Sequence, residues 1–172
     1  MSSNTDQSAI AGAATTGSMP ALRIVVDDLS GPEIAALLTD HLSDMAAHSP
    51  AESMHALDLA GLRRPEITFW SGWDGDTLAG CAALEQLDDE HAEIKSMRTA
   101  ATHKRRGIAS ILLRHLLAEA TARGYRRVSL ETGAGEFFVP AQKLYAAHGF
   151  EFCDPFGDYQ LDPYSVFMTR TL

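Results

Sequence analysis

"ATHKRRGIAS", residues 101–110, places a basic run and a glycine where an apolar run ends and a long amphipathic segment begins. A helix that begins here presents unpaired backbone N–H groups and the positive end of its dipole. Gly107 has no Cβ, so an anion can approach its amide, while Ala109 and Ser110 leave the first helical turn uncrowded. The stretch therefore predicts a phosphate-binding turn, and the alternative is a loop whose basic side chains are merely solvated.

The segments around this turn alternate between the periodicities of strands and helices. Two apolar runs joined across Asp74, Gly75 and Asp76 are typical of a tight hairpin. We expect strand segments over 22–26, 66–87 (the hairpin), 91–99, 126–132, 150–153 and 164–170, and helices over 33–48, 51–62, 108–125 and 140–149.

The composition fits one compact domain. The 172 residues are 45% hydrophobic, which suits a full core over residues 21–172, whereas residues 1–20 are small and polar and predict a flexible tail. The 23 acidic against 14 basic residues argue against a nucleic-acid-binding surface. No stretch is apolar enough to span a bilayer, so we expect no membrane contact. Cys81 and Cys153 have no CxxC spacing and no secretory signal precedes them, which predicts free thiols in a cytoplasmic protein.

Several motifs resemble the GCN5-related N-acetyltransferase (GNAT) superfamily. "KRRGIA", residues 104–109, matches the family's Gln/Arg-x-x-Gly-x-Gly/Ala pyrophosphate motif with Lys104 in the first position, and "LYAAHGFEF", residues 144–152, is similar to its second acetyl-CoA motif. Phe138 departs from the asparagine that many members carry ahead of the Ala-x-x-Leu-Tyr pattern. The set "EIKSM", "LETG" and "PAQKLY" looks like a bacterial subgroup of small GNAT enzymes. The resemblance implies an α/β (α+β) fold with a mixed, mostly antiparallel central sheet of about six or seven strands flanked by about four helices.

The same resemblance implies a reaction. It is acetyl transfer from acetyl-CoA to a primary amine of a small molecule or amino acid, by direct attack in a ternary complex and without a metal. Main chain near Met97 would pair with the pantetheine arm and hold the thioester carbonyl. The residues that the resemblance assigns to acetyl-CoA are Met97, Thr99, Lys104, Arg105, Arg106, Gly107, Ile108, Ala109 and Ser110. The alternative is a catalytically silent acyl-CoA-binding or regulatory module; a P-loop nucleotide hydrolase is disfavoured because no Gly-x-x-x-x-Gly-Lys-Ser/Thr run occurs.

Three side chains are candidates for proton transfer. Glu93 lies fourteen positions before Gly107, the spacing of the base in the histone-acetyltransferase branch, and Glu131 on a neighbouring strand is a second candidate base. A water chain without one dominant base is the third option. Tyr145 occupies the family's tyrosine position, where its phenol would protonate the departing CoA thiolate, and the alternative is a tyrosine that only packs in the core.

The acceptor pocket is expected to form around residues 48–58 and four aromatic side chains. The aromatic residues are Trp70, Trp73, Phe137 and Tyr159, and the polar groups of the loop are His48, Ser49, Glu52, His55 and Asp58. His41, His48 and His55 recur every seven residues, but Pro50 interrupts the helix between them, so no metal site is predicted. The expected partner is the small-molecule acceptor, and a homodimer is left open.

Overall fold

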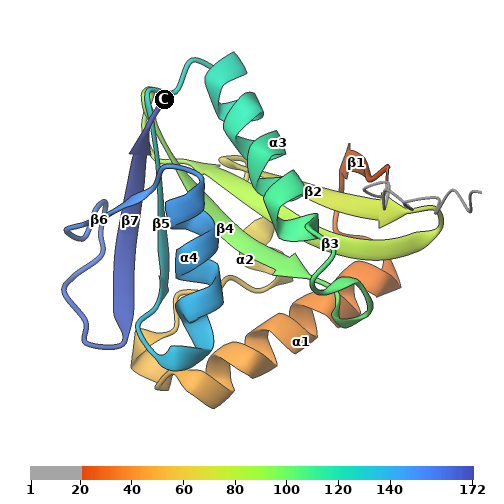
Figure 1. Cartoon of the computed structure of the whole chain (residues 1–172), viewed down its shortest axis with the longest axis horizontal. Helices are drawn as coiled ribbons and strands as arrows, with labels where there is room; N and C mark the ends of the chain where they lie inside the picture. The colour runs from red at the N-terminus through yellow and green to blue at the C-terminus, as the bar shows by residue number, and fades with distance from the viewer. Residues whose placement is uncertain (1–20) are drawn as a thin grey trace, which may run out of the picture.

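The computed structural model describes residues 21–172, and in this part of the chain a seven-stranded sheet carries helices on both faces (Figure 1). The predicted tail at residues 1–20 lies outside the described residues. The strands are β1 (Arg23–Val26), β2 (Ile67–Asp74), β3 (Thr77–Gln86), β4 (His91–Thr99), β5 (Arg127–Gly133), β6 (Glu151–Cys153) and β7 (Ser165–Thr171). The helices are α1 (Pro32–His48), α2 (Leu59–Leu62), α3 (Ile108–Ala122) and α4 (Val139–Ala147), with 3₁₀ turns η1 (Ala51–Ser53), η2 (Ala101–His103) and η3 (Glu136–Phe138).

The sheet has the strand order β1-β2-β3-β4-β5-β7-β6, and only the β4–β5 pair is parallel. The hairpin between β2 and β3 turns at Gly75, whose φ of 60° suits glycine. Helix α3 supplies the crossover that a parallel pair requires. The predicted mixed, mostly antiparallel sheet with four helices is therefore confirmed.

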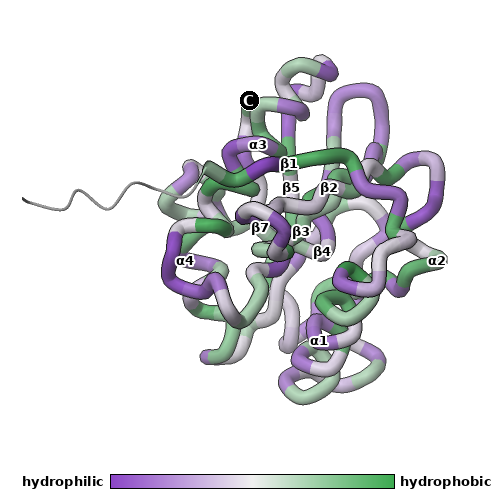
Figure 2. The backbone as a smooth tube through the Cα atoms, turned by 90° about the vertical axis from the view of Figure 1, so that its right-hand side faces the viewer, coloured by the Kyte–Doolittle hydropathy of each residue, from purple (hydrophilic) through white to green (hydrophobic). Residues whose placement is uncertain are grey.

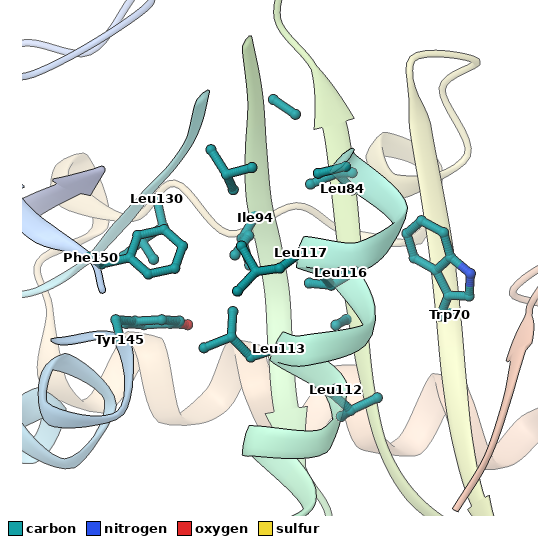
Figure 3. Packing of buried hydrophobic residues seen from close by; sticks show 14 of the residues in the cluster. Trp70, Leu84, Ile94, Leu112, Leu113, Leu116, Leu117, Leu130, Tyr145 and Phe150 are labelled. Carbon is teal, nitrogen blue, oxygen red and sulfur yellow. The ribbon is translucent and has the colours of Figure 1, made fainter. Parts of the chain in front are cut away.

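The sheet separates two layers of helices. In Figure 2 the strands lie between α4 on one side and α1 and α2 on the other. The larger hydrophobic cluster lies under α3, where Leu113 and Leu117 pack over Ile94 of β4 (Figure 3). A second cluster joins α1 to the opposite face through Ile34 and Leu38. The apolar sides of α3 and α1 thus both face the sheet.

The predicted helix over residues 51–62 is wrong in its extent. The segment forms the short turn η1 and the single-turn helix α2, with extended residues between them. Asp58 explains the interruption, because its backbone is extended and its carboxylate accepts a hydrogen bond from the amide of Gly61 at 2.8 Å. Asp58 is therefore a helix cap rather than a pocket residue.

Phe138, the departure from the family's asparagine, fits against a glycine. Its ring is buried and lies against Gly133 at the end of β5. A Cβ built on Gly133 would lie only 2.0 Å from the Phe138 ring. The bare backbone of Gly133 is thus what makes room for the larger side chain at residue 138.

Gly133→Ala is expected to destabilise the fold by about 3 kcal/mol, because the added methyl overlaps the Phe138 ring. The melting temperature should fall by roughly 6–12 °C for a chain of this size. Gly135→Ala is the matched control, because a Cβ there meets nothing within 4 Å. In a Phe138→Ala background the same Gly133 change should cost little, and an undiminished cost there would show that the overlap is not the cause.

Candidate active site

A cleft opens where β4 and β5 part. The two strands pair from His91–Arg127 to Ile94–Leu130 only, after which β4 stays with β3 and β5 stays with β7. In β4 a bulge inserts one residue between the pairs Ala83–Lys95 and Cys81–Arg98, and Ser96 in the bulge has a φ of 51°. A cavity of about 520 Å³ occupies this cleft and extends to α1, α4 and the start of α3.

The basic turn forms one end of the cavity. Arg105 and Gly107 both have left-handed backbone conformations, with φ of 62° and 77°, and α3 begins at Ile108. The first helical hydrogen bond runs from the amide of Ile111 to the carbonyl of Gly107, so the amides of residues 108–110 have no partner within the helix. Free amides, a positive helix end and two cations at the rim together suit an anion.

The side chains of the turn fall into two groups. Lys104 and Arg105 are exposed and line the cavity. Arg106 does not line the cavity. Its guanidinium instead contacts the Asp74 carboxylate at 3.1 Å, and the His103 imidazole lies 3.2 Å from the same carboxylate oxygen. Arg106 thus fixes the turn to the β2–β3 hairpin. The other residues that the sequence assigns to the cosubstrate all line the cavity: Met97, Thr99, Gly107, Ile108, Ala109 and Ser110.

Tyr145 lies at the inner wall of the cavity. Its ring is 7% exposed and packs against Phe150 of the main core (Figure 3). Burial raises the pKa of the phenol well above its ordinary value, and the nearby Glu131 carboxylate raises it further. The phenol therefore keeps its proton at neutral pH and can act as a hydrogen-bond donor.

Glu93 is buried within a network of hydrogen bonds. The Tyr159 hydroxyl donates to Oε1 of Glu93 at 2.5 Å, and Nζ of Lys95 lies 3.1 Å from the same oxygen. Lys95 also donates to the Tyr159 hydroxyl at 3.0 Å. Burial raises the pKa of Glu93, and the Lys95 charge and the Tyr159 hydrogen bond act against this rise. Glu93 is thus a buried carboxylate that forms an ion pair with Lys95.

Glu131 is held more loosely on the facing strand. The Ser165 hydroxyl donates to its Oε1 at 2.8 Å, and no Lys, Arg or His nitrogen in residues 21–172 lies within ion-pair distance of it. Burial raises the pKa of this carboxyl, while the Ser165 hydrogen bond and the distant His55 lower it. The cleft therefore contains one paired and one unpaired carboxylate.

A second cavity of about 520 Å³ adjoins the first one. His55, Glu93, Lys95 and Tyr159 line both cavities, so the Glu93 network forms their common wall. Glu52 lines only the second cavity. Lys95 was missed by the sequence reasoning, although it lies two positions after Glu93 on a strand and therefore on the same face.

The expected aromatic pocket is only half correct. Phe137 and Tyr159 line the first cavity, but Trp70 and Trp73 line neither cavity. Both tryptophans are on β2, two strands away from the cleft; Trp70 is buried under α3 and packs against His115. The prediction for these two residues is wrong because aromatic side chains on a strand are as often core as pocket.

The remaining polar residues of the loop have separate positions. Ser49 and His55 line the first cavity, whereas the His48 ring stacks on Phe137 with the ring centroids 3.8 Å apart. Within residues 21–172 no group of three His, Cys, Asp or Glu side chains is placed to hold a metal ion. In the same residues no helix is long and apolar enough to cross a membrane, and both Cys81 and Cys153 are free thiols.

Comparison with known proteins identifies the family. The family described as "Acetyltransferase (GNAT) family" matches residues 34–150. The chain belongs to the GNAT family of acetyltransferases. The uncharacterised N-acetyltransferase YsnE of Bacillus subtilis is 56% identical over 151 residues, which cover 88% of this chain and all of YsnE.

Solved structures agree with this GNAT fold. A crystal structure of a protein from Klebsiella pneumoniae matches with a TM-score of 0.72 and 23% identity, covering 89% of this chain and 99% of that one. A Bacillus subtilis acetyltransferase solved in complex with CoA matches with a TM-score of 0.63 and 19% identity, covering 88% and 99%. The GNAT sheet, its parted central strands and the basic turn therefore belong to an acyltransferase enzyme.

Proposed function

We propose that this GNAT enzyme transfers acetyl from acetyl-CoA to a primary amine by direct attack within a ternary complex. The observation that carries the proposal is the set of free amides at residues 108–110 beside the cations Lys104 and Arg105, at the end of a cleft between parted strands. The relative solved with CoA supports the choice of CoA over another phosphate ligand. Acetyl-CoA supplies an activated acetyl thioester.

The chain's own residues hold this cosubstrate in three ways. The amides of residues 108–110 and the left-handed turn at Gly107 bind the pyrophosphate. The main chain of β4 near Met97 and Thr99 faces the cavity and has lost β5 as a partner, so it pairs with the amides of the pantetheine arm. An N–H group near Met97 donates to the thioester oxygen as negative charge develops there.

Glu131 is the proposed base. A protonated amine has no lone pair, so the ammonium must first lose a proton to a carboxylate. Taking that proton at Glu93 would oppose its ion pair with Lys95, whereas within residues 21–172 no cation lies at ion-pair distance from Glu131. Glu131 and Tyr145 line the same cavity, and the Glu131 charge raises the pKa of the Tyr145 phenol, which supports assigning the two proton transfers to this pair.

Calorimetry with acetyl-CoA and with ATP tests the cosubstrate. We expect acetyl-CoA to bind and ATP not to bind, because the cleft offers main chain for an amide-bearing arm and no P-loop. Binding of ATP alone would overturn the proposal. Release of CoA in the presence of amines and amino acids then tests turnover, and acetyl-CoA binding without turnover on any acceptor would favour the silent module.

Tyr145→Phe is expected to lower kcat by about a hundredfold, the lower end for loss of a general acid, because it removes the proton donor for the CoA thiolate and a thiolate is a tolerable leaving group. Affinity for acetyl-CoA should change little, since the phenol acts mainly in the transition state, when negative charge develops on the departing CoA sulfur. Steady-state kinetics across pH measure the effect. Tyr125→Phe is the matched control, because Tyr125 packs against the core and does not line the cavity. An unchanged kcat, with chemistry rate-limiting, would make Tyr145 a packing residue only.

A further inference from the structure

Buried polar atoms without partners gather in one wall of the first cavity. Among residues 21–172 four buried side-chain atoms have no hydrogen-bond partner, and three of them are His41 Nδ1, Ser96 Oγ and Arg98 Nε. His41 comes from α1, whereas Ser96 and Arg98 come from the bulged part of β4, and all three residues line the cavity. A buried donor without a partner is costly, so a concentration of them indicates a ligand or water that supplies the missing bonds.

The chemistry of the three groups indicates a ligand with oxygen atoms that accept hydrogen bonds. Arg98 Nε can only donate, so its partner must be an acceptor. The Ser96 hydroxyl can donate as well, and burial together with the Arg98 charge lowers the pKa of His41 to about 4, so its imidazole is neutral and can carry a proton on Nδ1. These three atoms are buried, whereas their residues line the cavity with other atoms, so a side-chain rotation is what would turn each donor toward a bound group.

The charges divide the cavity into two ends. At one end Arg98 contacts the Asp44 carboxylate through Nη1 at 2.7 Å, and Lys104 adds a second cation beside that same carboxylate. The ion pair with Asp44 does not involve Nε of Arg98, which has no hydrogen-bond partner within residues 21–172. At the other end the Glu131 carboxylate has no ion-pair partner in the part of the chain that the structure describes. An acceptor with an ammonium group toward Glu131 and an anionic group toward Arg98 complements both ends.

The spacing is that of a small molecule. On β3, Ala83 is opposite Lys95 and Cys81 is opposite Arg98, so the Cα atoms of Lys95 and Arg98 are separated along the sheet by about 7 Å, at roughly 3.3 Å per residue. Glu131 is the first residue of β5 beyond the last β4–β5 pair, Ile94–Leu130, so it lies across the cleft from Lys95. The stretch of β4 from this point to Arg98 is therefore of the length of a small molecule.

We propose that Arg98, together with Ser96 and His41, binds the carboxylate of the acceptor, so that the substrate is an amino acid rather than a simple amine. This inference rests on the proposed N-acetyltransferase function. It assigns recognition of the carboxylate to the α1–β4 wall and leaves Glu131 and Tyr145 to the proton transfers. Arginine suits this role because its planar group can add a second oxygen partner while it keeps Asp44.

Matched pairs of acceptors test the inference. Initial rates of CoA release are measured with glycine and methylamine, β-alanine and ethylamine, γ-aminobutyrate and propylamine, and lysine and cadaverine, where the second member lacks the carboxyl group. For the accepted pair we expect kcat/KM to be about tenfold to a hundredfold higher with the amino acid, as charge-assisted hydrogen bonds would give. Arg98→Met should abolish this preference through KM, and Arg98→Lys should keep part of it.

The controls separate recognition from folding. Arg123→Met removes another arginine with a salt bridge, to Glu119 on α3, and should leave the preference intact. Ser96→Ala gives a milder variant if Arg98→Met does not fold, and it should reduce the preference by a smaller factor. Equal rates within each accepted pair, or a preference that persists in folded Arg98→Met, overturns the inference. Failure to bind acetyl-CoA, or binding without acetylation of any compound, would instead overturn the proposed function.

Discussion

Gly107→Glu is expected to reduce acetyl-CoA affinity by a hundredfold or more while the protein stays folded. The substitution places a carboxylate at the N-terminus of α3, where the amides of residues 108–110 are free for a phosphate group. The new anion repels the pyrophosphate and competes for the same amides. The left-handed backbone at residue 107, with a φ of 77°, adds about 1–2 kcal/mol of strain for a residue with a Cβ.

Two further variants separate charge from strain. Gly107→Asn carries no charge and tolerates the left-handed conformation better, so it should lose much less affinity than Gly107→Glu, and the loss that remains is due to the added Cβ. Gly124→Glu makes the same change at the other end of α3, where φ is 86° and nothing lies within 4 Å of a Cβ; it should bind acetyl-CoA normally. Calorimetry measures the acetyl-CoA affinity of each variant, and thermal melts measure its stability. Normal affinity in a folded Gly107→Glu protein would mean that the turn is only a solvated loop.

Local patterns predicted the fold because each element has its signal in consecutive residues. The apolar stripe of α3, the glycines at its two ends and the hairpin at Gly75 can all be identified from short spacings. The same local reasoning failed over residues 51–62, where the cap at Asp58 competes with a continuous helix. Composition alone could not show this competition.

The network around Glu93 could not be predicted, because its partners are distant in sequence. Tyr159 contacts Glu93 across 66 positions, and Asp44 of helix α1 contacts Arg98 of strand β4. Whether Glu93 or Glu131 forms an ion pair with a cation depends on contacts of this long-range kind. The sequence therefore supplied both candidate bases, Glu93 and Glu131, and their environments separate them.

Those environments lead to an expected loss of a hundredfold or more in kcat/KM for Glu131→Gln, as for removal of a general base. Glutamine keeps the size of the side chain, and its oxygen can still accept the hydrogen bond from Ser165. Glu93→Gln should cost less, because protonation of Glu93 during the reaction would oppose its ion pair with Lys95. Glu119→Gln on the surface of α3 is the matched control and should leave kcat/KM unchanged.

The pH dependence gives an independent test of Glu131. A base works only when ionised, and burial raises the pKa of Glu131 above the ordinary glutamate value of about 4.3. In the wild type kcat should therefore fall as the pH decreases through that raised pKa and level off above it. In Glu131→Gln this acidic limb should disappear, and only ionisation of the amine remains. A limb retained in Glu131→Gln but lost in Glu93→Gln would assign the base to Glu93, and a limb retained in both would favour a water chain.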